Sequence, residues 1–212
     1  MYTHEKNIIK AGLPASEAKR AIIMIHGRGA SAESIVSLAG HLNLDDAAIY
    51  APQASNHSWY PYSFMAPVKE NQPALDSALQ LIGNTVLEIV REGISLNRIY
   101  FLGFSQGACL SLEYVTRNAA KYGGVIAFTG GLVGQELNLD NYKGNFERTP
   151  LLITTGDPDP HVPVSRVEES IKVIEGLNGA VTSRVYKGRP HTIQMEEINL
   201  ANDLILKTDG EF

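Results

Sequence analysis

The stretch "FLGFSQGACLS", residues 101–111, joins the end of an apolar run to a segment of small and helix-forming residues. Gly103 and Gly107 lie two residues before and two residues after Ser105. Such a glycine pair lets a strand and the next helix approach closely, and the serine between them is held in a strained turn called a nucleophile elbow. The stretch predicts a strand, turn and helix with Ser105 as nucleophile, and the alternative is an ordinary turn serine.

Apolar runs of the same kind recur along the chain and alternate with segments of helical spacing. The runs begin at Ala21, Ala47, Arg98, Gly124 and Pro150, with a weaker sixth run from Thr182. They are continuous rather than alternating, as in strands that are buried on both faces of a parallel sheet. The helical segments are Ala32 to His41, Pro73 to Glu92, Gln106 to Lys121, Val164 to Leu177 and Ile193 to Lys207.

This alternation predicts the α/β class, with a mostly parallel central sheet and helices on both faces. We expect one domain over residues 1–212, because the chain is long enough for one sizeable core and contains no linker or repeat. Ligands of such sheets bind beyond the carboxyl ends of the strands. The long aromatic loop from Ser55 to Pro73 is a further candidate for function.

A serine nucleophile needs a base that takes its proton and an acid that orients the base. In this architecture the expected order along the chain is Ser, then Asp or Glu, then His. Asp157 and Asp159 follow the run that begins at Pro150, and His191 follows the run that begins at Thr182. Each group follows a strand end, so the sequence predicts that they meet Ser105 at one edge of the sheet.

An oxyanion hole must bind the negative charge of the tetrahedral intermediate. The stretch "HGRGAS", residues 26–31, follows the first strong apolar run and is the expected source of one backbone N–H, that of Arg28. The N–H of Gln106, directly after the nucleophile, is the expected second donor. A tight turn between strand and helix is the plainer interpretation of His26 and Gly27, and both interpretations can hold together.

Over nearly its full length the chain resembles the phospholipase/carboxylesterase family of α/β-hydrolases, which includes the acyl-protein thioesterases. The motifs that carry the resemblance are "HGRGAS", "GFSQG", "GDPDPHVP" and "GRPH". The resemblance implies a compact α/β-hydrolase fold without a cap. It also implies that the acid is the aspartate of the pattern G-x-x-D-x-x-V-P, which is Asp159 rather than Asp157.

Several residues are candidates for substrate binding. Acyl-protein thioesterases typically carry an apolar residue at the position of Arg28. We consider that Arg28 and Arg189 attract an anionic substrate, against the alternative that both are solvated loop charges. Trp59, Tyr60, Tyr62 and Phe64 form either a rim for an acyl or aryl group or simple loop packing. Cys109 is expected to be a small buried residue rather than a second nucleophile.

Composition excludes several other functions. The net charge of −5 and the scattered Lys and Arg residues argue against nucleic acid as a partner. One cysteine excludes an internal disulfide and a cysteine-based zinc site, and we expect neither metal nor cofactor. Without a secretory signal or an apolar run of about 20 residues, the sequence predicts a cytoplasmic protein with no stable membrane insertion. Capless hydrolases can form homodimers through exposed apolar surface near the pocket, so a homodimer is among the expected states.

We therefore predict a serine hydrolase that cleaves small-molecule carboxylic esters or thioesters through an acyl-enzyme, with Ser105, Asp159 and His191 as catalytic triad. One alternative is a binding protein of the same fold without catalysis. Another is an enzyme that resembles dienelactone hydrolase and acts on small anionic substrates, although relatives with that chemistry carry cysteine at the elbow. A metal site at Asp157, Asp159 and His161 is a third, but the intervening prolines do not favour convergence of the three side chains.

Overall fold

The computed structural model describes residues 2–207, and one seven-stranded sheet runs through them in the order β1-β3-β2-β4-β5-β6-β7. All neighbouring strands are parallel except β1, which pairs antiparallel with β3 at one edge. The strands are β1 (Ile8–Gly12), β2 (Arg20–Ile25), β3 (Ala47–Pro52), β4 (Ile99–Phe104), β5 (Gly124–Phe128), β6 (Pro150–Asp157) and β7 (Ala180–Lys187). The predicted mostly parallel sheet is confirmed.

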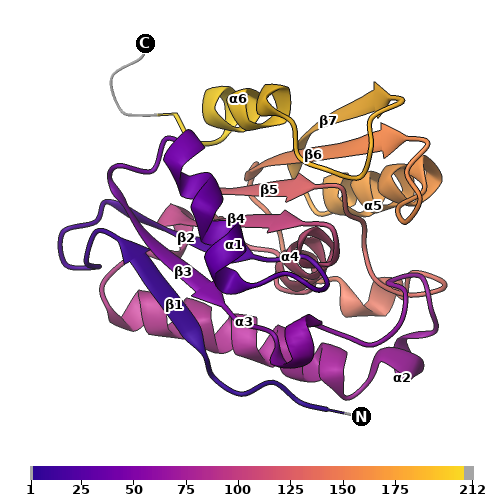
Figure 1. The fold of residues 1–212 in the computed structure, drawn as a ribbon, viewed down its shortest axis with the longest axis horizontal. Coiled ribbons are helices and arrows are strands. Elements are labelled where there is room, and N and C mark those ends of the chain that lie inside the picture. Colours follow the sequence, from indigo (N-terminus) through magenta and orange to yellow (C-terminus); the bar gives the residue numbers. More distant parts are fainter. Residues whose placement is uncertain (1, 208–212) are drawn as a thin grey trace.

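Helices cover both faces of this sheet (Figure 1). The α-helices are α1 (Ala32–Val36), α2 (Val68–Asn71), α3 (Ala74–Arg91), α4 (Gln106–Arg117), α5 (Val164–Gly176) and α6 (Met195–Leu204). Short 3-10 helices are η1 (Ser37–His41), η2 (Ser55–His57), η3 (Leu96–Arg98) and η4 (Leu139–Asn141). The helix expected over residues 32–41 is thus an α-helical turn followed by a 3-10 segment.

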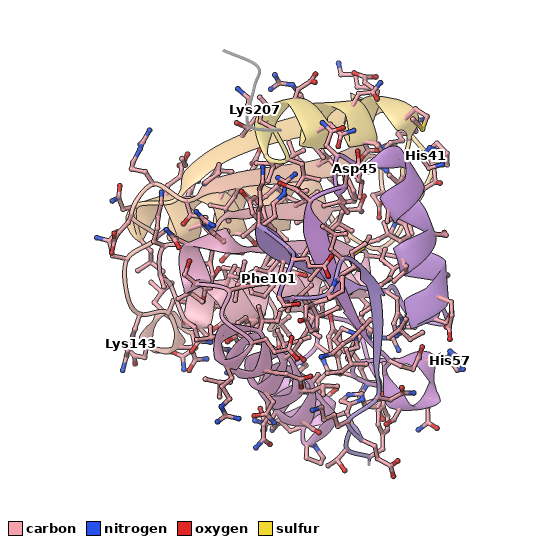
Figure 2. All side chains as sticks on the ribbon, turned by 90° about the vertical axis from the view of Figure 1, so that its left-hand side faces the viewer. His41, Asp45, His57, Phe101, Lys143 and Lys207 are labelled. Carbon is pink, nitrogen blue, oxygen red and sulfur yellow. The ribbon has the colours of Figure 1, made fainter. Side chains whose placement is uncertain are left out.

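Two apolar layers follow from the alternation of side chains along the strands. In β2, Ile23 and Ile25 face the layer that contains α3, α4 and α5, whereas Ile22 and Met24 face the layer that contains α1 and α6. Phe101 of β4 lies deep between the elements, while Lys143 and Lys207 lie at the periphery (Figure 2). Burial on both faces explains why the central strands are continuously apolar.

The strand β1 is an element that the sequence analysis does not predict. Its five residues, "IIKAG", are only partly buried, because it lies at the edge of the sheet and runs antiparallel to β3. An apolar run this short, followed by a charged residue, gives a weak strand signal. The connection between β5 and β6 contains only the short helix η4, so this part of the chain has no helical cap of the kind that some hydrolases carry.

The carboxyl ends of the parallel strands β4, β6 and β7 point toward the same side of the molecule (Figure 1). The chain leaves β4 at Ser105, and the loops after β6 and β7 contain Asp159 and His191. The fold thus brings the three predicted catalytic residues to one edge of the sheet.

Candidate active site

Ser105 lies at a sharp turn between β4 and α4. Its backbone has φ 55° and ψ −118°, in a region that residues with a side chain rarely adopt. Its N–H donates to the carbonyl of Phe128 in β5 at 3.0 Å, and its own carbonyl accepts from the N–H of Cys109 at 3.0 Å. These bonds on both sides fix the turn, so the hydroxyl has a defined position at the start of α4.

The two glycines of the motif are required by close backbone contacts. A Cβ atom at Gly103 would overlap the carbonyl oxygen of Gly107, and one at Gly107 would overlap the carbonyl oxygen of Ile25 in the neighbouring strand β2. Helix α4 therefore begins in direct contact with two strands. This packing is the geometry that the glycine spacing predicts for a nucleophile elbow.

Ser105, His191 and Asp159 form a continuous hydrogen-bonded chain. The Nε2 atom of His191 lies 2.8 Å from the Ser105 Oγ, and its Nδ1 atom lies 2.9 Å from Oδ2 of Asp159. The ring is thereby oriented so that one nitrogen faces the nucleophile and the other faces the acid. Phe104 packs beside this ring, with 5.1 Å between the ring centroids.

The Asp159 carboxylate has hydrogen-bond partners on both oxygens, and its side chain is 0% exposed. Its Oδ1 accepts from the backbone N–H groups of His161 and Val162, each at 2.9 Å. Burial raises the pKa of Asp159, but the hydrogen bonds from His191 and from these two N–H groups outweigh burial, so the pKa lies below its ordinary value. The acid is therefore held ionised and pointed at Nδ1 of His191.

The two backbone N–H groups predicted for an oxyanion hole, those of Arg28 and Gln106, both lie at the candidate site. Neither donates to a protein acceptor within residues 2–207, so both remain available to a substrate oxygen. The loop of Arg28 is supported from below by His26, whose Nδ1 lies 2.7 Å from the carbonyl of Gly27 and whose Nε2 accepts from the N–H of Ala54 at 3.1 Å. Burial lowers the pKa of His26, which keeps this supporting ring neutral.

The side chain of Gln106 connects the elbow to the loop that includes residues 58–60. Its Oε1 accepts from the N–H of Trp59 at 2.9 Å, and its Nε2 donates to the carbonyl of Tyr60 at 2.8 Å. A residue whose N–H is a candidate oxyanion donor thus also anchors the aromatic loop. The sequence analysis assigned a role only to its backbone.

A cavity of about 570 Å³ opens over Ser105 and His191. Its other lining residues include Gly27, Arg28, Tyr60, Tyr62, Phe64, Phe104, Gln106, Cys109 and His161. The lining is mostly apolar and aromatic, and a few polar groups converge on the nucleophile, which is typical of a small-molecule site.

Of the predicted substrate-binding residues, Arg28, Tyr60 and Tyr62 line this cavity, and Tyr62 is 57% exposed at its mouth. Trp59 does not line it. The Trp59 side chain is 0% exposed, donates from Nε1 to the carbonyl of His26 at 2.8 Å and packs on the His26 ring. The prediction that Trp59 forms part of the rim is wrong, because the loop turns this side chain into the core.

Arg189 also differs from its prediction. Only 3% of it is exposed, and its guanidinium donates to Thr129 Oγ1 and to the carbonyl of Thr192. A carboxylate oxygen of Glu197, itself fully buried, lies 3.4 Å from it. Arg189 is neither a solvated charge nor a ligand for a substrate. It lies in the same loop as His191 and forms a buried ion pair with Glu197.

His161 and Cys109 also line the cavity, although the sequence predicted neither as a catalytic or substrate-binding residue. His161 is exposed and lies edge-on to His191, with 4.9 Å between the ring centroids. Its position two residues after Asp159 is the only signal in the sequence that could have placed it there. Cys109 is buried as predicted, and burial raises the pKa of its thiol to about 12, so it remains a thiol.

Residues 2–207 contain no group of three or more His, Cys, Asp or Glu side chains with an arrangement that could hold a metal ion. Asp159 and His161, two of the three residues of the alternative metal site, make other contacts instead of converging on a common point. The Asp159 oxygens accept from His191 and from backbone N–H groups, and the His161 ring lies against His191.

Among residues 2–207, no helix has the length and apolar character that crossing a membrane requires.

An open parallel sheet with an elbow serine at the carboxyl end of a central strand defines the class of α/β-hydrolases. Comparison with known proteins agrees with this class. The chain belongs to the phospholipase/carboxylesterase family, whose sequence profile matches residues 6–208.

Similar proteins of known structure or name extend this result. A crystal structure of a phospholipase/carboxylesterase from Dyadobacter fermentans is 64% identical, covers 98% of this chain and 99% of its own, and superimposes with a TM-score of 0.97. Acyl-protein thioesterase 1 from Kluyveromyces lactis is 27% identical over 91% of this chain and 93% of its own length. Acyl-protein thioesterase 1 homolog 1 from Dictyostelium discoideum is 32% identical over 71% of this chain and 67% of its own. The chain is thus a hydrolase of the esterase and thioesterase class.

Proposed function

We propose that this protein hydrolyses carboxylic esters, and thioesters of similar size, through an acyl-enzyme formed on Ser105. The single observation that carries the proposal is the hydrogen-bonded chain from the Ser105 Oγ through His191 to Asp159, at 2.8 and 2.9 Å. Ser105 and His191 line a cavity large enough for a small ester, and Asp159 lies behind His191.

In the first half of the reaction, the Ser105 oxygen attacks the substrate carbonyl while Nε2 of His191 takes its proton. The carbonyl oxygen becomes an oxyanion, which the N–H groups of Arg28 and Gln106 bind. His191 then gives the proton to the leaving alcohol or thiol as the carbon–oxygen or carbon–sulfur bond breaks. The product of this half is an ester between the acyl group and Ser105.

In the second half, water replaces the alcohol. His191 removes a proton from the water as the water oxygen attacks the acyl carbon, and it then returns the proton to the Ser105 oxygen as the acid leaves. Asp159 orients the imidazole and stabilises its protonated form in both halves.

The activity test compares the wild type with Ser105→Ala and His191→Ala on 4-nitrophenyl acetate and butyrate. Removing any member of such a triad should lower kcat by about 10⁴-fold or more while the fold persists. Matched control substitutions are Ser63→Ala, in the cavity wall, and His57→Ala, on the exposed loop, which should lower kcat far less. Full activity in Ser105→Ala would contradict the proposal, because the nucleophile would then be another residue. A wild type that cleaves neither ester would instead favour a binding protein of the same fold.

A further inference from the structure

The cavity over Ser105 is lined by one arginine and two imidazoles, and no acidic side chain of residues 2–207 lines it. Arg28 is its one permanently charged lining residue, and His161 adds a second imidazole beside that of His191. The side chain of Asp159 is buried behind His191, and both of its oxygens already have hydrogen-bond partners. Although the protein carries a net charge of −5, the permanently charged side chain that lines this cavity is positive.

The charge of Arg28 is not neutralised by any carboxylate within residues 2–207. Its guanidinium donates instead to three neutral oxygens. These are Ser58 Oγ at 3.2 Å and the Pro61 carbonyl at 2.7 Å, both from Nη1, and the Tyr62 carbonyl at 2.6 Å, from Nη2. The group is therefore fixed in position and keeps its full charge.

Two donor N–H groups of Arg28 remain without a protein acceptor in the described part of the chain. A guanidinium has five N–H groups, and the three bonds above use both on Nη1 and one on Nη2. The remaining donors are on Nε and Nη2, the two nitrogens that a carboxylate bridges in a side-on, bidentate arrangement. Because the side chain is already held by the loop, little further conformational entropy is lost when a carboxylate binds.

We propose that the preferred substrates of this site are esters that carry a carboxylate, which Arg28 binds while Ser105 attacks the ester carbonyl. The proposal rests on the hydrolase function proposed above and adds the substrate class to it. Arg189, which the sequence also suggested for this role, does not take part because it is buried and paired with Glu197.

The test uses two pairs of substrates that differ in charge. In the first pair the acyl group is charged or neutral: 4-nitrophenyl hydrogen adipate against 4-nitrophenyl hexanoate. In the second pair the leaving group is charged or neutral: 4-carboxyphenyl acetate against methyl 4-acetoxybenzoate. For each enzyme variant the ratio of kcat/KM for the charged ester to that for the neutral ester is measured, so that a general loss of activity cancels from the comparison.

Arg28→Gln should lower this ratio by up to about fivefold in at least one pair, since an exposed, preorganised ion pair contributes up to about 1 kcal/mol. Arg28→Lys should restore part of the ratio, because it keeps the charge without the bidentate fork. Arg91→Gln, which removes the same charge outside the cavity, should leave the ratio at its wild-type value. In the wild type the ratio should fall as NaCl is raised from 0.05 to 0.5 M.

The two proposals fail in different ways. If the wild type cleaves the neutral esters through Ser105 but the ratios are the same in Arg28→Gln and insensitive to salt, the carboxylate class is wrong and the hydrolase function stands. If no ester of either pair is cleaved, the hydrolase function is itself contradicted. Should Arg28→Gln lose all activity, the salt dependence of the wild-type ratio and the ratio in Arg28→Lys still decide the question.

Discussion

Ser105 adopts a left-handed backbone conformation that its neighbours impose. The turn is tied to β5 through Phe128 and flanked by two glycines whose missing side chains allow α4 to touch β2 and β4. The sequence predicted this unit because the glycine spacing and the adjoining apolar run are local features. Strain at a turn that the surrounding packing determines is a feature of functional sites.

The glycine contact gives a prediction at the scale of one residue. Gly107→Ala should lower the free energy of unfolding by about 1–3 kcal/mol, because its Cβ would overlap the Ile25 carbonyl and force strand and helix apart. The control is Gly176→Ala in the last turn of α5, where a Cβ has no atom within 4 Å and should be neutral or stabilising. Urea unfolding of both variants is the measurement, and equal stabilities would contradict the packing described for the elbow.

The sequence did not predict the directions in which the side chains of Trp59 and Arg189 point. Trp59 and Tyr62 have the same aromatic character in one loop, yet Trp59 is in the core and Tyr62 is at the cavity mouth. Arg189 and Arg28 are both loop arginines, but only Arg189 has a buried acid to pair with, contributed by a helix that follows it in the chain. Such partners depend on how elements pack, so residue type and spacing alone do not identify them.

At the scale of elements, the loop after β7 places His191. Arg189 of this loop connects Thr129 after β5 with Glu197 of α6, and the Thr154 hydroxyl of β6 donates to the other oxygen of Glu197. The loop that contains His191 is therefore held by a buried network that joins the end of β5 and strand β6 to α6. The motif "GRPH" indicated the loop but gave no sign of its support.

Breaking this network should destabilise the fold strongly. Glu197→Ala leaves Arg189 buried without its acid and should lower the free energy of unfolding by about 3–5 kcal/mol. Lys6→Ala, which removes an ion pair to Glu88 from a side chain that is 66% exposed, should cost less than about 1 kcal/mol. Urea denaturation measures both, and a loss for Glu197→Ala no greater than that for Lys6→Ala would show that the pair does not hold the loop.

At the scale of the whole molecule, the predicted sheet and its helices are confirmed apart from the edge strand β1. The six predicted strands, β2 to β7, lie side by side in the sheet. The central strands are continuously apolar because helices cover both faces of the sheet. The order Ser, Asp, His and the position of each group after a strand end predicted that they meet at one sheet edge, whereas the choice of Asp159 over Asp157 came from the family resemblance. Strand β1 lacks that signal, since its pairing with β3 rather than its own burial makes it a strand.

Whole-molecule stability should fall in acid. Hydrogen bonds from Lys6 and, to a smaller extent, Lys10 lower the pKa of Glu88. Hydrogen bonds from Lys10 and, to a smaller extent, Tyr50 lower the pKa of Glu92. The pKa of Asp159 is lowered as described above. A carboxyl whose pKa is lower in the folded state stabilises the fold above its unfolded pKa, near 4.5 for Glu and 3.8 for Asp, and this contribution is lost as pH falls through the lowered values.

Urea midpoints measured between pH 6 and pH 2.5 check this. The midpoint should be roughly constant down to about pH 5 and then decrease, as the folded carboxylates are forced to take up protons. Lys10→Met, which removes a partner of both Glu88 and Glu92, should decrease less steeply over the same range. A midpoint that rises toward pH 3 would contradict the directions of these pKa shifts.

Covalent trapping tests whether Ser105 is the nucleophile. The protein is treated with a fluorophosphonate, and intact-protein and peptide mass spectrometry then locate the adduct. We expect one phosphonyl group per chain, on the peptide that contains Ser105, and no labelling of Ser105→Ala. An unlabelled wild type, or an adduct on any other residue, would contradict it.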